Sequence, residues 1–186
     1  MINDLQKLRI IYKLKNVERM CSVQNRKESS AEHSWSSLIL ADFLMKKISI
    51  KLDKLKVYEL LMYHDLVEII VGDICITKEK ERENKKEVER KASKVLATKL
   101  PQNLSEKYFS LFEEYEEGKT IEAKFAKAID ALDPQIHQLD HIQDWVGWTE
   151  EFLRRKKGPL IKDFPELKIL FEELMTFQKK NGYFDQ

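Results

Sequence analysis

The sequence has few of the residues that break helices or cross-link a chain. Its 186 residues include five glycines, four prolines and two cysteines. Because so few residues interrupt helices, the main pattern in the sequence is the spacing of apolar residues at helical intervals. The cysteines, Cys21 and Cys75, form no spaced motif and indicate no disulfide framework. We therefore expect reduced thiols and a cytoplasmic protein.

Long apolar runs and an excess of one charge are also missing. No segment approaches the roughly 18 apolar residues that a membrane span needs. The first twenty residues lack the apolar core and the cleavage site of a secretory signal. Lys+Arg 33 against Asp+Glu 32 leaves a net charge of +1, whereas dedicated nucleic-acid binders usually carry a basic excess. These absences predict a protein that neither enters a membrane nor binds nucleic acid.

Helical spacing of apolar residues predicts an all-α bundle of seven to nine helices. No repeat and no linker divides the chain, and its length suits one domain, 1–186. The helices are expected at about 5–16, 31–48, 54–71, 78–100, 104–117, 121–145, 149–157 and 166–180. Residues 22–30 read as a polar loop, and no pair of strands is evident.

Several residues mark where these helices should begin and end. Ser29 lies three residues before Glu32, which is the spacing of a capping box. Further N-terminal caps are expected at Asp53, Thr77 and Thr120, and helix ends at Gly72, Gly118, Gly158-Pro159 and Asn181-Gly182. Pro134 should kink the helix that contains it.

The most apolar helix carries four side chains that a protein core disfavours. In "LMYHDLVEIIVGDI", residues 61–74, these are His64, Asp65, Glu68 and Asp73. His64 and Glu68 are four residues apart and share a helix face. Burying such charges unpaired would cost several kcal/mol each, and a shared cation would remove that cost. Imidazole and carboxylate groups together suit divalent ions such as Mn²⁺, Fe²⁺, Co²⁺, Ni²⁺ and Zn²⁺.

Two ligands make a weak site, and two residues elsewhere can complete it. His33 begins its helix directly after the polar loop, and Asp130 lies among apolar residues in "KAIDALD". The His64-Asp65 pair taken alone also fits a histidine satisfied by a neighbouring acid. His137 and His141 have metal-ligand spacing as well, but we interpret them as a polar helix face or a dimer surface.

His33, His64-Asp65 and Asp130 occur in the order H…HD…D, which resembles the HD-domain metal-dependent phosphohydrolases. The segments "VQNRKESSAEHSW", "YHDLVEIIVGDI" and "EAKFAKAIDAL" are similar to those of the 5'-deoxynucleotidase branch of that family. The resemblance covers about residues 5–145, and the helices in 149–186 are expected to pack on this core. It implies a helical homodimer that hydrolyses (deoxy)nucleoside 5'-monophosphates with one divalent metal ion, of which Mn²⁺, Co²⁺, Mg²⁺, Fe²⁺, Ni²⁺ and Zn²⁺ are candidates.

The resemblance also implies a role for individual residues. It implies that the metal ligands are His33, His64, Asp65 and Asp130. It implies that the catalytic acids are Glu68 and Asp73, and that the substrate is contacted by Arg19, Thr77 and Lys78. Glu68 would orient or deprotonate a water molecule, while Asp73 would share that task or protonate the leaving oxygen. The alternative is that both acids only orient ligands, and that Arg19 interacts with a helix end. Met20 stands where the branch often has tryptophan.

Two other functions remain open from the sequence. An HD phosphohydrolase could act on another phosphorylated small molecule, such as a nucleoside polyphosphate. The chain could also be a nucleotide-binding regulatory module with a silent metal site, although the intact set of His33, His64, Asp65 and Asp130 argues against degeneration. A cyclic-dinucleotide phosphodiesterase is disfavoured, because those enzymes usually add histidines for a second metal.

Overall fold

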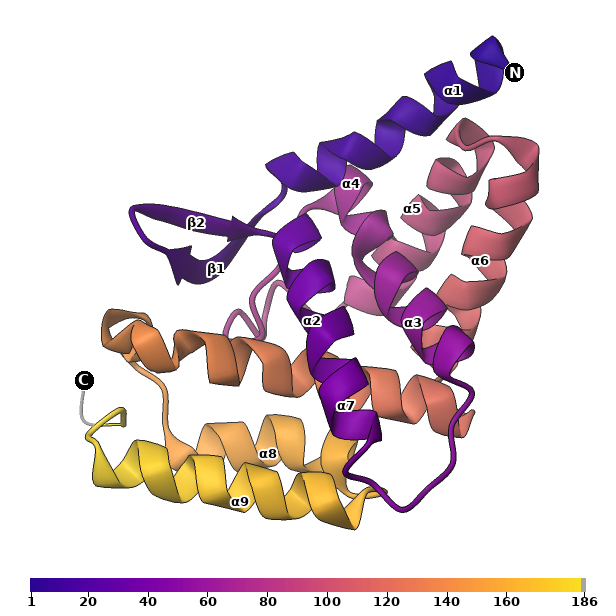
Figure 1. The fold of residues 1–186 in the computed structure, drawn as a ribbon. Coiled ribbons are helices and arrows are strands. Elements are labelled where there is room, and N and C mark those ends of the chain that lie inside the picture. The colour runs from indigo at the N-terminus through magenta and orange to yellow at the C-terminus, as the bar shows by residue number, and fades with distance from the viewer. Residues whose placement is uncertain (185–186) are drawn as a thin grey trace.

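Helix α7, Ile121–His137, is the central element of the computed structural model, which describes residues 1–184 (Figure 1). It contacts α2, α3, α6 and α8. The other α-helices are α1 (Ile2–Leu8), α2 (Ser30–Met45), α3 (Lys54–Tyr63), α4 (Glu68–Val71), α5 (Lys85–Lys99), α6 (Gln102–Glu117), α8 (Glu150–Ile161) and α9 (Pro165–Lys180). Short 3-10 helices are η1 (Arg9–Asn16), η2 (His64–Val67), η3 (Gln138–Asp140) and η4 (Ile142–Trp145). The predicted all-α helical bundle is confirmed.

Most of the expected helix caps are present. Ser29 and Glu32 form the complete capping box at the start of α2. The side chains of Asp53 and Thr120 accept hydrogen bonds from the first turns of α3 and α7. Gly118 ends α6 in a left-handed conformation, which glycine adopts without steric cost. Local sequence therefore determines these helix boundaries.

The prediction that Thr77 caps a helix is wrong. Helix α5 begins at Lys85, and the charged residues before it form turns. Glu79 in these turns pairs with Arg155 at 2.9 Å and also with Lys156, both on α8. The segment before α5 thus contacts a distant helix, and its helical composition alone does not make it helical.

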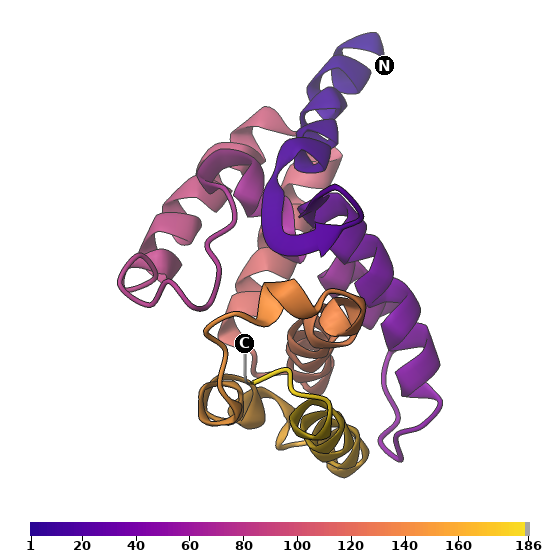
Figure 2. The same cartoon turned by 90° about the vertical axis from the view of Figure 1, so that its left-hand side faces the viewer.

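A β-hairpin replaces the polar loop expected at residues 22–30. Strands β1 (Glu18–Val23) and β2 (Arg26–Ser29) pair antiparallel, and Gln24 in the turn between them has a φ of 51°. The Ser22 amide and hydroxyl both donate to Asp144, at 2.7 and 2.8 Å. Figure 2 looks onto this hairpin, with α1 projecting above it. A contact with η4 therefore stabilises strands that have no strong local pattern.

Three further boundaries differ from the sequence-based expectation. The helix expected at 54–71 is divided by η2, and α7 ends at His137 rather than Trp145. Pro134 lies in the last turn of α7, where the missing amide weakens continuation of the helix. Helix α8 continues through Gly158-Pro159 to Ile161, because a proline this close to the end removes only one hydrogen bond.

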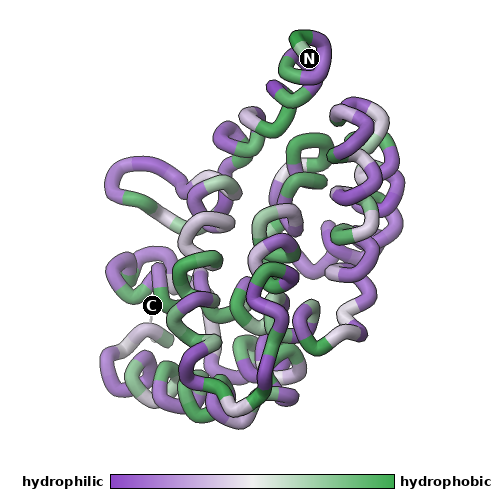
Figure 3. Tube along the Cα trace, turned by 45° about the vertical axis from the view of Figure 1, so that its right-hand side comes forward, coloured by the Kyte–Doolittle hydropathy of each residue, from purple (hydrophilic) through white to green (hydrophobic). Residues whose placement is uncertain are grey.

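The buried residues form two clusters. The larger joins α2, α3 and α7 to α8 and α9, and the smaller lies among η1, η2, α5 and α6. Figure 3 shows hydrophobic stretches alternating with hydrophilic ones along these helices, as expected for helices with one buried face. Leu60 belongs to the first cluster and Val67 to the second, so both hold the backbone around His64. Within residues 1–184, no helix has the length and apolarity to cross a bilayer.

Candidate metal centre

Three separate elements bring the predicted metal ligands together. His33 lies in the first turn of α2, His64 begins η2, and Asp130 lies in α7. One ligand atom from each of these residues falls within 4.8 Å of the others. The Nε2 atom of His33 is 2.9 Å from Oδ1 of Asp130, and that of His64 is 3.7 Å from the same oxygen.

Asp65 also lies beside the two histidines. Its Oδ1 is 3.2 Å from Nε2 of His64, and its Oδ2 is 3.9 Å from Nε2 of His33. All four residues expected to bind metal therefore converge. The side chain of Asp130 remains 34% exposed, so the group opens on one side.

The donor set fits a divalent cation. Nδ1 of His64 donates a hydrogen bond to the carbonyl of Leu61 at 2.7 Å, so the neutral form of the ring has its lone pair on Nε2. That Nε2 is buried and has no hydrogen-bond partner within residues 1–184. Metal bonds of about 2.1 Å place neighbouring ligand atoms roughly 3 to 3.5 Å apart, close to the separations seen here. A lone pair that faces two carboxylates is a stable arrangement when a cation lies between them.

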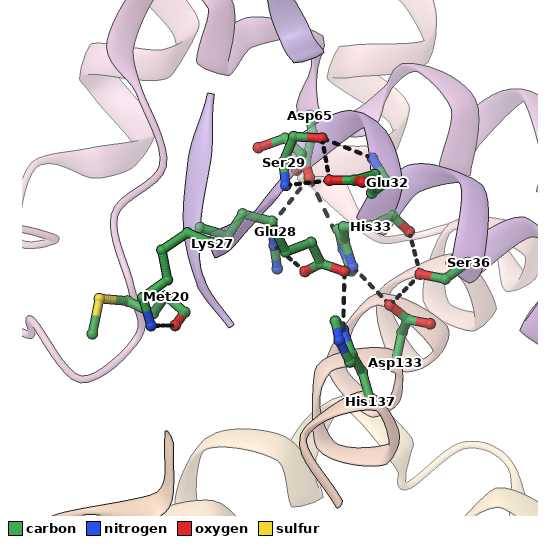
Figure 4. Close-up of polar contacts among 12 residues, drawn as sticks. Met20, Lys27, Glu28, Ser29, Glu32, His33, Ser36, Asp65, Asp133 and His137 are labelled. Atoms are coloured by element: carbon green, nitrogen blue, oxygen red, sulfur yellow. Dashed lines mark hydrogen bonds and ion pairs between the residues drawn. The ribbon is translucent and has the colours of Figure 1, made fainter. Parts of the chain in front are cut away.

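Asp133 orients His33, a role that the sequence analysis did not predict. Its Oδ2 accepts hydrogen bonds from Nδ1 of His33 and from Oγ of Ser36, each at 2.8 Å (Figure 4). Such a carboxylate fixes the ring and directs Nε2 toward the ion. Asp133 lies three residues after Asp130 and so shares its helix face, a spacing that offered a usable signal.

His33 and Asp130 form an ion pair when no cation is bound. Burial and Arg19 oppose protonation of His33, but hydrogen bonds to Asp130 and Asp133 outweigh them and raise the pKa of His33 to about 10. Burial also opposes ionisation of Asp130, yet the hydrogen bond to His33 and the nearby ring of His64 hold the pKa of Asp130 well below its usual range. A cation must therefore displace a proton from His33 Nε2.

Glu68 and Asp73 lie beside the ligands on the same stretch of chain. Glu68 is buried, and its Oε2 accepts a hydrogen bond from Oγ of Ser30 at 2.6 Å. Burial, reinforced by the charges of Asp65 and Asp73, raises the pKa of Glu68 well above its ordinary value. Asp73 follows Gly72, whose φ of 75° turns the chain sharply after α4.

Arg19 is held between two acids. Its Nη1 donates to Asp65 at 3.2 Å, and its Nε lies 3.4 Å from Glu28. Glu28 is buried and also accepts a hydrogen bond from Nδ1 of His137 at 3.0 Å. Glu28 was not expected from the sequence, because nothing in the polar segment 22–30 indicated that this acid is buried. Among residues 1–184, no second ligand cluster contains His137 or His141.

A cavity of about 360 Å³ opens beside the metal ligands. Its walls include Arg19, Met20, Glu68, Asp73 and Asp130. The ligand group therefore borders a space in which a small molecule can bind.

Thr77 and Lys78 are exposed and do not line this cavity. Thr77 donates to the sulfur of Cys75 at 3.2 Å, and Lys78 pairs with Glu81 at 3.5 Å. Their placement gives no support to a role in substrate binding.

Known proteins are similar to this chain in sequence and in the arrangement of helices. The 5'-deoxynucleotidase HDDC2 of Bos taurus is 32% identical over 184 residues, which cover 96% of this chain and 87% of that protein. The Homo sapiens protein of that name is 30% identical over 95% of this chain and 87% of its own length.

Solved structures agree. A structure from Magnetospirillum magnetotacticum, described as a predicted metal-dependent phosphohydrolase, superposes with a TM-score of 0.81 at 30% identity and covers 96% of this chain and 92% of that one. An HD-domain phosphohydrolase from Listeria innocua, at 20% identity, has the same fold with a TM-score of 0.69 over 97% of this chain and 92% of its own. The family model described as HD domain matches residues 11–168. The chain belongs to the HD-domain family.

Proposed function

We propose that this protein is a metal-dependent phosphoric monoester hydrolase acting on (deoxy)nucleoside 5'-monophosphates. The observation that carries the proposal is the convergence of His33, His64, Asp65 and Asp130 at one end of a cavity that Arg19 also lines. A cation and a guanidinium at the same end of a pocket suit a terminal phosphate. The names of the relatives, 5'-deoxynucleotidases, support the choice of substrate.

His33, His64, Asp65 and Asp130 would hold one divalent ion. Nitrogen and oxygen ligands suit Mn²⁺, Co²⁺, Fe²⁺, Ni²⁺ and Zn²⁺, and Mg²⁺ remains a candidate because two of the ligands are carboxylates. When bound, the ion would polarise a phosphoryl oxygen and lower the pKa of a water molecule.

The surrounding side chains would perform the remaining steps. Glu68, whose pKa is raised by burial, is a stronger proton acceptor than an ordinary glutamate and would deprotonate the attacking water. Arg19 uses Nη1 on Asp65 and places Nε beside Glu28, so its Nη2 is left to bind a phosphate oxygen. Asp73 lines the same cavity and would protonate the leaving 5'-oxygen.

The test is phosphate release from a panel of nucleotides with Mn²⁺, Co²⁺ or Mg²⁺. We expect release from dAMP or dGMP and none from a nucleoside 3'-monophosphate, because the 5'-phosphate must reach both Arg19 and the metal ligands. Preferred hydrolysis of a nucleoside polyphosphate would favour the other substrate class. Tight nucleotide binding without any turnover would indicate a regulatory module instead.

Replacing Asp133 with asparagine is expected to weaken metal binding about 10- to 100-fold. An amide can still contact the ring of His33, but it no longer provides the negative charge that holds Nδ1 protonated and Nε2 directed at the ion. Titration of the metal-free protein with Mn²⁺ measures the change. Ser36→Ala serves as the control, because it removes the other hydrogen bond to Asp133 and leaves the carboxylate. Equal affinity in Asp133→Asn and the parent protein would exclude the orienting role.

We also propose that the protein is a homodimer in the cytoplasm. Trp35, Ile39 and Phe43 recur every four residues along one face of α2, and they are 67%, 58% and 57% exposed. Contiguous exposed apolar residues of this kind favour association with another protein surface. Symmetric pairing of two copies is the commonest outcome for soluble oligomers.

Ile39→Asp is expected to convert the dimer to a monomer, since it places a charge in the middle of this apolar face. Molar mass from light scattering after gel filtration provides the measurement. Val88→Asp, at another exposed aliphatic position, should leave the mass unchanged. A monomeric parent protein, or a dimer that persists in Ile39→Asp, would contradict the proposed interface.

A further inference from the structure

Lys157 is a buried cation in the cavity that forms no direct ion pair with a residue of the described chain, although Asp130 and Asp133 are near enough to favour its charged form. The cationic residues of the cavity are Arg19, Arg82, Lys85, Lys127, Lys156 and Lys157. Five of them have partners, namely Asp65 for Arg19, the Ile74 carbonyl for Arg82, Glu89 for Lys85, Glu116 for Lys127 and Glu79 for Lys156. Lys157 is 5% exposed and forms no hydrogen bond or ion pair within residues 1–184. Burial lowers its pKa to about 8, so it is still mainly charged at neutral pH.

Gln138 is a second buried polar side chain at the same place. It lies at the start of η3, is 5% exposed and also lines the cavity. Its backbone carbonyl accepts a hydrogen bond from Trp145 at 2.9 Å, but its side-chain amide has no partner in the described part of the chain. Both side chains reach the cavity, so a ligand that displaces water there has to pair with them or leave them unpaired at a cost.

The wall around these two residues suits a flat ring. Trp148 lines the cavity, and its own ring packs against Trp145 and Phe152 at centroid distances of 5.8 and 5.7 Å. Met20 and Leu160 add further apolar surface. Aromatic side chains stack on any of the nucleobases. Hydrogen bonds to the edge of the base then distinguish one base from another.

Lys157 lies near a different residue of β1 than the phosphate end does. Arg19 contacts Asp65, an expected metal ligand, whereas Cys21, two residues further along the strand, lies near Lys157, as Asp130 and Asp133 do. Two residues of a strand span roughly 7 Å. A deoxyribose can bridge such a distance between a 5'-phosphate on Arg19 and a base beside Lys157.

We propose that Gln138 and Lys157 form a nucleobase subsite that selects bases with an exocyclic oxo group. The ammonium of Lys157 has only donors and requires an acceptor, which an oxo group provides and an amino group does not. Gln138 has both a donor and an acceptor, so it can pair with the ring nitrogen next to the oxo group. The inference rests on the proposed nucleotide substrate and specifies its base.

The experiment compares dIMP and dAMP, purine nucleotides that differ at the 6-position, where dIMP has an oxo group and dAMP an amino group. Their Kd values are measured by calorimetry on the full chain loaded with Mn²⁺ and carrying Glu68→Gln to block turnover. We expect about tenfold or tighter binding of dIMP, which is typical of one hydrogen bond to a charged group. Adding Lys157→Met should abolish this preference, whereas adding Lys156→Met, the paired neighbour on the same helix, should preserve it.

A purely structural role for Lys157 predicts a different pattern. Loss of a structural contact would lower the Tm of Lys157→Met, whereas removal of an unpaired buried ammonium should leave it equal or higher. The proposal is overturned if dIMP and dAMP bind equally to the parent, or if their ratio is unchanged in Lys157→Met. Phosphate release by the wild-type chain is measured in parallel. It reports on the proposed hydrolase function independently of any base preference.

Discussion

Asp65→Ala is expected to abolish metal binding and phosphohydrolase activity together. Asp65 is one of two carboxylates facing the histidine nitrogens, and its Oδ1 lies 3.2 Å from Nε2 of His64. Removing it leaves one negative ligand, and a small ligand set tolerates such a loss poorly. Elemental analysis of the purified variant gives the metal content, and phosphate release from dAMP gives the activity.

Asp73→Ala is the matched control for metal content. Asp73 is an acid in the same cavity, but it is not one of the four residues expected to bind the ion. It should keep one metal per chain whatever happens to its turnover. A thermal melt of Asp65→Ala confirms that the fold is intact, because Asp65 is buried beside Arg19. Full metal occupancy in a folded Asp65→Ala protein would remove Asp65 from the ligand set.

Glu68→Ala is expected to retain the metal and to lower kcat by about 10² or more, as loss of a general base usually does. Glu68 is not one of the four converging ligands, and its carboxylate is held by Ser30 at 2.6 Å. Ser30→Ala removes only that hydrogen bond, so it should reduce kcat far less. An unchanged kcat in Glu68→Ala would exclude the residue from the reaction.

The pH dependence of Glu68→Ala gives an independent measurement. Burial, together with Asp65 and Asp73, raises the pKa of Glu68. The deprotonated form accepts the proton, so the rate of the parent protein should fall as the pH decreases through this raised pKa. In Glu68→Ala the residual rate should lose that acid limb. An acid limb that persists unchanged would assign it to another group.

The sequence indicated the residues expected to bind metal because their chemistry conflicts with their surroundings. His64 and Asp65 lie in an apolar stretch, and Asp130 lies in another, so each required a compensating partner. Asp133 and Glu28 are equally buried acids. The sequence did not indicate them. Asp133 follows Asp130, an acid that already accounts for the polar position in this apolar helix, and the strands around Glu28 have no clear alternation of apolar and polar residues.

The turns before α5 and the β-hairpin are the two segments whose structure the local sequence did not predict. Residues 78–84 have helical composition, yet Glu79 is paired with Arg155 on a helix 76 residues away. Strand β1 is anchored by Asp144, 122 residues from Ser22. Such contacts exist only after the helices have packed, and no short window of sequence contains them.

By itself the sequence determined the all-α fold and most helix caps, and it indicated the four residues that are expected to bind an ion. The fold class and the caps depend on apolar spacing and on hydrogen bonds between residues three or four apart, which are short-range in the chain. Only the tertiary structure decided that Asp133 orients His33 from 100 residues away and that Lys157 lies unpaired in the cavity. Partners of that kind are chosen by how the helices pack, because a hydrogen bond or a charge pair acts over a few ångströms of space regardless of the separation in sequence.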